Sequence, residues 1–276
     1  MRTQVAAWEV VPDRRCIFLK CYSLMTEAMT QSLDPVHFQD PAWVEQLITN
    51  FAGYYFAALD AYERGEDAPL AWRRAHELAG VSGLVAQQHL LLGINAHINH
   101  DLPLSVCDVM AAEWTGADVL RRDARRADFM AVNSVIATIM GIVEHDVCEH
   151  YDRHLGAIEA RLSPVVRLGE NVTAMVIDSW RDEAWSNAVR LAEATPGQRQ
   201  AILGEIEEGS LHRVHAIVAE GEEMERLEHL CLRFSADLRS AHAALGIHSL
   251  RLHPELAGDP RAATRLAEVL SSPPPG

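Results

Sequence analysis

The sequence predicts an all-α protein, a single-domain bundle of about seven to nine helices. Three observations support this fold class: apolar residues recur with the helical period, alternating strand-like patterns are scarce, and Pro and Gly separate the periodic segments. Hydrophobic residues make up 49% of the 276 residues, which is enough for a sizeable core. We therefore expect one helical domain over residues 18–252, an N-terminal extension over residues 1–17, and a partly disordered C-terminal tail over residues 253–276.

Capping and breaking residues divide the first half of the chain into four predicted helices. Asp40 and Pro41 form an N-cap and a first turn typical of a helix start. Pro103 disfavours helical backbone at the residue before it, so a helix should end near Asp101. The four predicted helices cover residues 18–32, 41–62, 70–78 and 84–101.

The second half of the chain is predicted to contain longer helices. One begins near Asp128 and continues to residue 162, where Pro164 follows. The next covers residues 170–193. Pro196 then opens a region of one or two amphipathic helices that reaches residue 245.

Composition excludes several classes of protein. The formal net charge of −15 disfavours non-specific binding to a phosphate backbone. No run approaches 18 apolar residues, and the N-terminus lacks the apolar stretch of a signal peptide. Five cysteines without a CxxC pair favour reduced thiols over a disulfide framework. We expect a cytoplasmic protein that acts on a small molecule and binds neither nucleic acid nor membrane; a homodimer is left open.

The segment 87–104 concentrates ligand-type side chains on one helical stripe. Within an arc of roughly 120° on a helical wheel lie His89, His97, His100 and Asp101. Ala86 and Gly93 share that arc, and their small side chains should leave space above it. The helix is apolar nearly all round, which implies burial. Buried His and Asp need partners, which either a metal ion or a hydrogen-bonded network can supply.

A histidine pair on a later helix offers further metal ligands. His150 and His154 are four residues apart and share a face, the geometry with which two imidazoles bind one metal ion. Apolar residues on the same face indicate that the pair points toward the core. Asp128, several turns earlier, falls near that side.

Arg181 lies at the edge of the apolar face of the helix over residues 176–191. An inward arginine requires an acidic partner or an anionic substrate. Trp185 could flank the same pocket. We therefore predict that Arg181 and Trp185 bind substrate, with a buried salt bridge as the alternative role for Arg181.

The run Gly93–Leu104, GINAHINHDLPL, resembles a bacterial family of unknown function, domain-of-unknown-function family 5995. The aromatic segment 51–60 and the Trp180–Trp185 segment fit the same family, so the resemblance extends from about residue 43 to residue 191. It implies no activity, because none is attached to the family as a whole.

Two looser similarities suggest chemistry. His100-Asp101, with His76 upstream and Asp128 downstream, is similar to the H…HD…D order of HD-domain metal phosphohydrolases, although Leu-Pro stands where those proteins have Gly-Lys. His97-x-x-x-Asp101 is similar to one motif of helical zinc phospholipases. Their further HxxxD motifs and their mature N-terminal Trp are not present.

The leading hypothesis is a metal-dependent enzyme acting on a small metabolite, and whether that metabolite is anionic is left open. The predicted ligands of a zinc, iron or manganese ion are His97, Asp101, His150 and His154. His100 or Asp128 would act in acid–base catalysis. The set lacks the paired Glu-x-x-His motif of di-iron bundles, which favours hydrolysis slightly over oxygen chemistry.

Two alternatives remain open at the level of sequence. One is a metal-free acid–base enzyme that catalyses an elimination, isomerisation or cyclisation with the same His and Asp side chains. The other is a non-enzymatic helical binding protein in which these residues form a structural polar core.

Overall fold

The computed structural model describes residues 1–11, 13–80, 84, 86–151 and 176–218, without the side chains of residues 87 and 140–151. The chain divides into one compact unit over Met1–Val218 and a second over Ala219–Gly276. The second unit lies outside the described residues, and so does the predicted domain boundary at residue 252.

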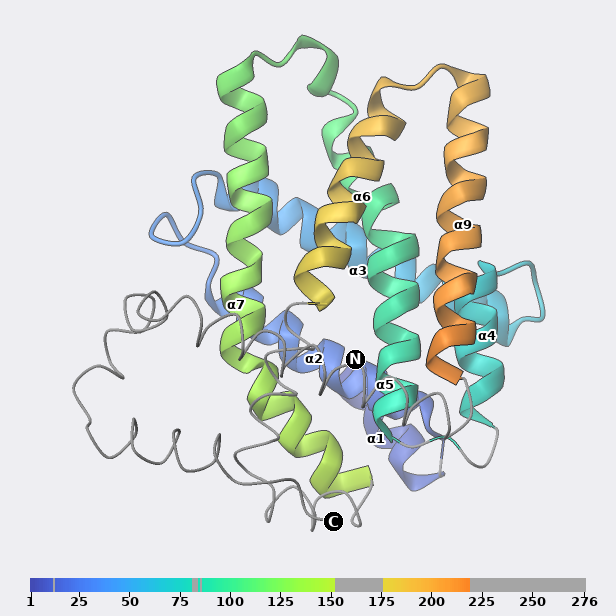
Figure 1. Ribbon diagram of the computed structural model, residues 1–276. Helices are drawn as coiled ribbons and strands as arrows, with labels where there is room; N and C mark the ends of the chain where they lie inside the picture. Colours follow the sequence, from blue (N-terminus) through green and yellow to red (C-terminus); the bar gives the residue numbers. More distant parts are fainter. Residues whose placement is uncertain (12, 81–83, 85, 152–175, 219–276) are drawn as a thin grey trace, which may run out of the picture. The chain divides into compact units, whose positions relative to one another are not determined.

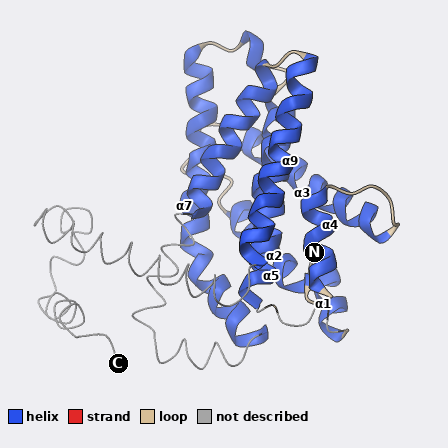
Figure 2. Ribbon diagram, turned by 45° about the vertical axis from the view of Figure 1, so that its right-hand side comes forward, coloured by secondary structure: helices blue, strands red, loops and turns tan. Residues whose placement is uncertain are grey.

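The described residues form helices joined by loops and contain no β-strand, which confirms the predicted all-α class (Figure 2). A further helical segment, over residues 176–193, precedes the last helix. The helices with described bounds are α1 (Arg2–Val10), α2 (Arg15–Gln31), α3 (Pro41–Glu63), α4 (Leu70–Ala79), α5 (Ala86–Asn95), the π-helix η1 (Ala96–Asp101), α6 (Leu102–Met110), the 3-10 turn η2 (Trp114–Gly116), α7 (Val119–Tyr151) and α9 (Pro196–Val218).

The N-terminal residues belong to the helical unit. We expected an extension over residues 1–17, but α1 and the first turn of α2 lie within that range. Val5 and Trp8 of α1 are buried, and the Arg15 guanidinium lies 4.5 Å above the Trp8 ring. Burial of these two apolar side chains against α2 gives the short helix the tertiary support that an isolated helix of this length lacks.

The predicted end of a helix near Asp101 is wrong, because the chain stays helical from α5 through η1 into α6. Pro103 explains the π-helix. It has no N–H to donate, and its ring collides with the carbonyl of the preceding turn in a regular α-helix, so a wider turn relieves both conflicts. In Figure 1 the teal rod of α5 and α6 stands beside α9, and α5 and η1 both pack on α9.

Gly93 allows α2 to approach α5 closely. A Cβ atom at residue 93 would lie 2.3 Å from Cγ of Phe18. The space that we expected above the His/Asp stripe is therefore filled by the Phe18 ring, not left open for a ligand.

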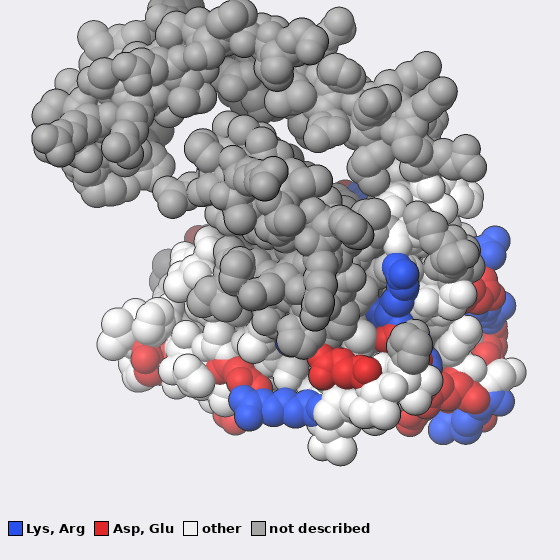
Figure 3. Space-filling view, turned by 90° about the horizontal axis from the view of Figure 1, so that it is seen from below, with Lys and Arg blue, Asp and Glu red and all other residues white. Residues whose placement is uncertain are grey.

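The charges on the described surface are mixed in sign. On the face seen in Figure 3, Lys and Arg lie beside Asp and Glu, and the described part of that face carries no extended basic area. No helix in the described part of the chain is long and apolar enough to cross a membrane.

Candidate active site

Asp101, the last residue of η1, is the centre of a buried polar cluster. Its Oδ2 accepts hydrogen bonds from Nε1 of Trp72 at 2.7 Å and from Nδ1 of His97 at 3.2 Å. Its Oδ1 accepts one from Nδ1 of His100 at 2.9 Å. An ionised carboxylate only accepts, so both imidazoles carry a proton on Nδ1 and turn Nε2 away from Asp101.

The local sequence explains why these groups meet. His97 and Asp101 are four residues apart and share a helical face, and the π-helix brings the adjacent His100 to the same carboxylate. Trp72 comes from α4, so its hydrogen bond to Asp101 joins α4 to η1. The sequence indicated the three η1 residues as a cluster but did not reveal Trp72.

The His97 ring lies inside a group of aromatic side chains. It stacks on Phe51 with the ring centroids 3.6 Å apart, and it meets the Tyr22 ring edge-on at 4.3 Å. Phe18, Tyr55 and Trp72 complete the surroundings within centroid distances of 5.6, 6.3 and 6.1 Å. Nε2 of His97 has no hydrogen-bond partner among the described residues.

Burial and hydrogen bonding act differently on the charge states of His97 and Asp101. Burial lowers the pKa of His97, and the opposing effect of Asp101 does not outweigh it. Burial alone would raise the pKa of Asp101, but the hydrogen bonds from His100 and His97 outweigh it and lower that pKa. Near neutral pH the cluster therefore holds an ionised carboxylate beside a neutral His97.

His100 is the member of the cluster that reaches the surface. Its side chain is 12% exposed, against 4% for His97 and 1% for Asp101.

Two asparagines of the same run, residues 93–104, connect it to α9. Nδ2 of Asn95 donates to the carbonyl of Ser210 at 2.9 Å, and Nδ2 of Asn99 donates to Oδ1 of Asn95 at 3.0 Å. Both asparagines are buried. Sequence reasoning missed them, although two amides four residues apart on an apolar helix were the available signal.

The predicted metal ligands are only partly within the described region. His97 and Asp101 are in contact, whereas the His150 side chain and all of His154 lie outside it. Among the described residues, no three His, Cys, Asp or Glu side chains are placed to hold a metal ion. His89 lies apart from the cluster, with its Nε2 3.3 Å from Nη1 of Arg14. The four-ligand site stays a prediction.

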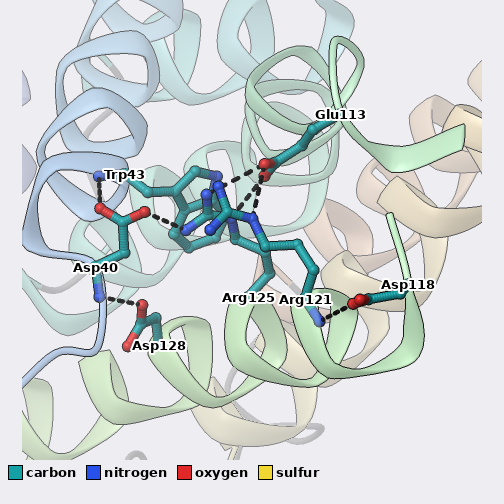
Figure 4. Close-up of polar contacts among 7 residues, drawn as sticks. All are labelled: Asp40, Trp43, Glu113, Asp118, Arg121, Arg125 and Asp128. Carbon is teal, nitrogen blue, oxygen red and sulfur yellow. Dashed lines mark hydrogen bonds and ion pairs between the residues drawn. The ribbon is translucent and has the colours of Figure 1, made fainter. Parts of the chain in front are cut away.

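Asp128, predicted as an acid–base residue, holds the loop before α3. Its Oδ1 accepts from the backbone N–H of Gln39 at 2.7 Å, and its Oδ2 accepts from that of Asp40 at 2.9 Å. Figure 4 shows the contact between Asp40 and Asp128 beside the ion pairs of buried Arg125 with Asp40 and Glu113. No hydrogen bond joins Asp128 to the described side chains around Asp101.

Arg181 and Trp185, predicted to bind substrate, are buried against α7. The Arg181 guanidinium donates to the carbonyl of Phe129 at 2.9 Å and to Oδ1 of Asn133, and it lies 4.4 Å above the Phe129 ring. Burial lowers the Arg181 pKa to about 10. Trp185 packs on the rings of Phe129 and Trp114. Through these contacts Arg181 and Trp185 pack between helices. Substrate binding by the two residues stays a prediction.

A surface cavity of about 440 Å³ lies between α1 and α2. It shares no residue with the cluster around Asp101. The residues that line it are Met1, Arg2, Ser23, Thr26, Glu27, Thr30 and Gln31. The polar cluster around Asp101 and this cavity are therefore separate features of the structure.

Fold and cluster together define an all-helical protein with a buried Asp–His–Trp centre built on a π-helix. Residues 1–220 match the family of unknown function DUF5995, and the chain belongs to that family. No curated protein and no solved structure matches the chain. The similarities to HD-domain proteins and to zinc phospholipases thus rest on short motifs alone.

Proposed function

We propose that the protein is an acid–base enzyme acting on a small molecule, with His100 as the group that exchanges a proton with the substrate. The observation that carries this proposal is the 2.9 Å contact between Nδ1 of His100 and the buried Asp101 carboxylate, on the one ring of the cluster that reaches the surface. A carboxylate that holds an imidazole by Nδ1 leaves Nε2 as the reactive atom.

Each neighbour has a definite part in this chemistry. Asp101 fixes the His100 tautomer, and its negative charge stabilises the imidazolium that forms when Nε2 accepts a proton. Trp72 and His97 hold the carboxylate in place as neutral donors. A substrate with an acidic C–H or O–H group would lose its proton to Nε2. The imidazolium would return that proton to another atom of the substrate in an isomerisation or cyclisation, or to the departing group in an elimination.

A comparison of two histidine substitutions tests the proposal. A panel of small metabolites is screened for conversion by the wild-type protein, by His100→Asn and by His212→Asn, which changes an exposed histidine of α9. We expect His100→Asn to lower the rate by about 10²–10⁴-fold while the protein stays folded, and His212→Asn to leave it unchanged. Equal rates for all three proteins would refute a catalytic His100.

A metal-dependent enzyme is the second candidate, and a specific observation supports it: Nε2 of His97 is fully buried without a partner among the described residues. An imidazole held by a carboxylate through Nδ1 is a common metal-ligand arrangement. With Asp101, His150 and His154 it would bind zinc, iron or manganese. The two oxygens of Asp101 accept three hydrogen bonds, which leaves one lone pair of Oδ1 for direct ligation.

Elemental mass spectrometry of the purified protein distinguishes the two candidates. A metal-dependent enzyme should carry about one equivalent of metal or more, lost in both His97→Ala and His150→Ala because a shared site needs both ligands. A protein that remains metal-free after anaerobic reconstitution, yet converts a substrate through His100, would leave only the metal-free enzyme.

A further inference from the structure

The rod formed by α5, η1 and α6 runs antiparallel to α9, and the two are in register along α5. Nε2 of Gln88 donates to the carbonyl of Ile217, and Nδ2 of Asn95 donates to the carbonyl of Ser210, both at 2.9 Å. From the first contact to the second, the rod advances seven residues and α9 goes back seven. Seven residues are close to two turns of a regular α-helix, so both contacts lie on one face of the rod.

The rod contains one residue more than α9 between the second contact and a third. Nη1 of Arg199, in α9, donates to Sγ of Cys107, in α6, at 3.4 Å. From Asn95 to Cys107 the rod advances 12 residues, whereas α9 goes back only 11 from Ser210 to Arg199. In a regular α-helix 12 residues would turn Cys107 roughly 120° away from Asn95, whereas 11 would leave them about 20° apart. Because both side chains contact α9, the rod has turned as if one residue were absent.

The face of the rod toward α3 leads to the same count. His97 stacks on Phe51, and Nδ2 of Asn50 donates to Oγ of Ser105 at 3.2 Å. The eight residues from His97 to Ser105 would give a rotation of roughly 80° in a regular α-helix, whereas seven would give about 20°. Two different faces therefore indicate one extra residue in this part of the rod.

The backbone places the extra residue in η1. The N–H of Leu102 bonds to the carbonyl of His97, five residues earlier, where a regular α-helix reaches back four. A turn that closes over five residues spaces successive side chains more closely around the helix axis. This spacing suits the contacts of His97 and His100 with the single carboxylate of Asp101.

Pro103 follows this turn directly. It has no N–H to donate, and in a regular α-helix its ring would collide with the carbonyl of Asn99. We infer that η1 carries one inserted residue, and that Pro103 is the positioning residue that holds the insertion at His100 and Asp101. Without the proline the wider turn can form elsewhere in the rod, because the contacts with α9 and α3 fix only the parts on either side. The catalytic consequence rests on the function proposed for His100, whereas the register rests on the helix contacts alone.

Removal of the extra residue tests the insertion. Deletion of His100, combined with Pro103→Ala, leaves the N–H of Leu102 and the carbonyl of His97 four residues apart, as in an α-helix. Deletion of Gly204 is the matched control, since it takes an exposed residue from α9, a regular α-helix with no wider turn to give up. We expect the first variant to unfold cooperatively in urea with a midpoint close to that of the wild type, and the control to have a far lower midpoint. Equal loss of stability in both deletions would overturn the insertion.

The single substitution Pro103→Ala tests the positioning role. Pro41→Ala is its control, because Pro41 lies in the first turn of α3, where the helix needs no N–H from it. The measurements are the scalar coupling across the hydrogen bond from Leu102 to His97, the slowly exchanging Nδ1 proton of His100, and the rate of substrate conversion. We expect Pro103→Ala to stay folded, to lose both signals, and to convert substrate about 10²-fold more slowly. Pro41→Ala should change none of the three.

The outcomes separate this inference from the proposed function. An intact coupling and an intact Nδ1 proton in Pro103→Ala would overturn the positioning role of Pro103. Loss of both signals with an unchanged rate of conversion would support the positioning of the turn by Pro103, and would refute the proton exchange proposed for His100.

Discussion

At the scale of single residues, Gly93 shows how one missing side chain determines a helix contact. Its Cα lies so close to Phe18 that an added methyl group would overlap Cγ and Cδ2 of the ring and the Phe18 Cβ. Phe18 in turn contacts Tyr22, Tyr55 and His97. A disturbance at residue 93 therefore reaches the aromatic surroundings of the candidate site.

We predict that Gly93→Ala destabilises the protein by about 1–3 kcal/mol, because overpacking a filled core forces side chains from their preferred rotamers. Gly204→Ala is the control: Gly204 lies in α9, with no atom within 4 Å of an added Cβ. There alanine should stabilise by about 0.5–1 kcal/mol through helix propensity. Urea unfolding of both variants gives the two values, and a stabilising Gly93→Ala would contradict the packing described here.

The residue scale also shows what the sequence could reveal about the site. Spacing on a helical wheel placed His97, His100 and Asp101 together, and they are in contact. The wheel could not show that Trp72 donates to Asp101, because a periodic pattern identifies a buried face but not the side chain that meets it. His89 shared the predicted arc yet contacts Arg14 instead.

At the scale of elements, helices bounded by capping residues were predictable. The expected ranges 41–62 and 70–78 differ by one residue each from α3 and α4. Asp40 explains the first match, since its side chain accepts from the backbone N–H of Trp43, as an N-cap does. The region after Pro103 was not predictable, because a π-helix lets the chain pass a proline that normally ends a helix.

Asp128 belongs to this scale, because it connects α7 to the start of α3. We predict that Asp128→Ala destabilises the protein by about 1–3 kcal/mol, since two backbone N–H groups lose their acceptor. Hydrogen exchange should accelerate at the amides of Gln39 and Asp40. Asp123→Ala, at an exposed position five residues earlier in α7, should change neither quantity.

The same variant decides between two roles for Asp128. If substrate conversion persists in Asp128→Ala while exchange at the two amides accelerates, the residue serves the fold alone. Loss of conversion with unchanged exchange would restore the acid–base role that the sequence suggested.

At the scale of the whole molecule, the contacts that join distant segments were beyond prediction. Asn95 meets the carbonyl of Ser210, 115 residues later, and Gln88 meets that of Ile217. One sequence gives the polarity of each helix face, but the order in which helices pack depends on the shapes of all of them together. The class of fold follows from periodicity, whereas the neighbours of each helix do not.

Buried histidines should make the stability of the whole molecule depend on pH. Burial lowers the pKa of His76, which stacks on Trp72, to about 4. The unfolded chain has an ordinary histidine pKa of about 6.5, so it binds more protons than the folded protein between these two values. Stability is therefore full above about pH 6.5 and falls as the pH drops toward 4.

We predict that His76→Gln removes part of this dependence. For one histidine with this shift, the free energy of unfolding should fall by about 1–2 kcal/mol from pH 7 to pH 5. Urea unfolding at both pH values should show at least that fall in the wild type, because the pKa values of His89 and His97 are also lowered by burial. The fall should be smaller in His76→Gln, whereas exposed His212→Gln should keep the wild-type difference. Buried carboxylates such as Asp101 have a lowered pKa. They lose their contribution to the free energy of unfolding only below the ordinary carboxyl pKa of about 4, so they do not affect the comparison between pH 7 and pH 5. An identical pH difference in His76→Gln and the wild type would mean that His76 is protonated in the folded core, and that its burial against Trp72 is weaker than the structure indicates.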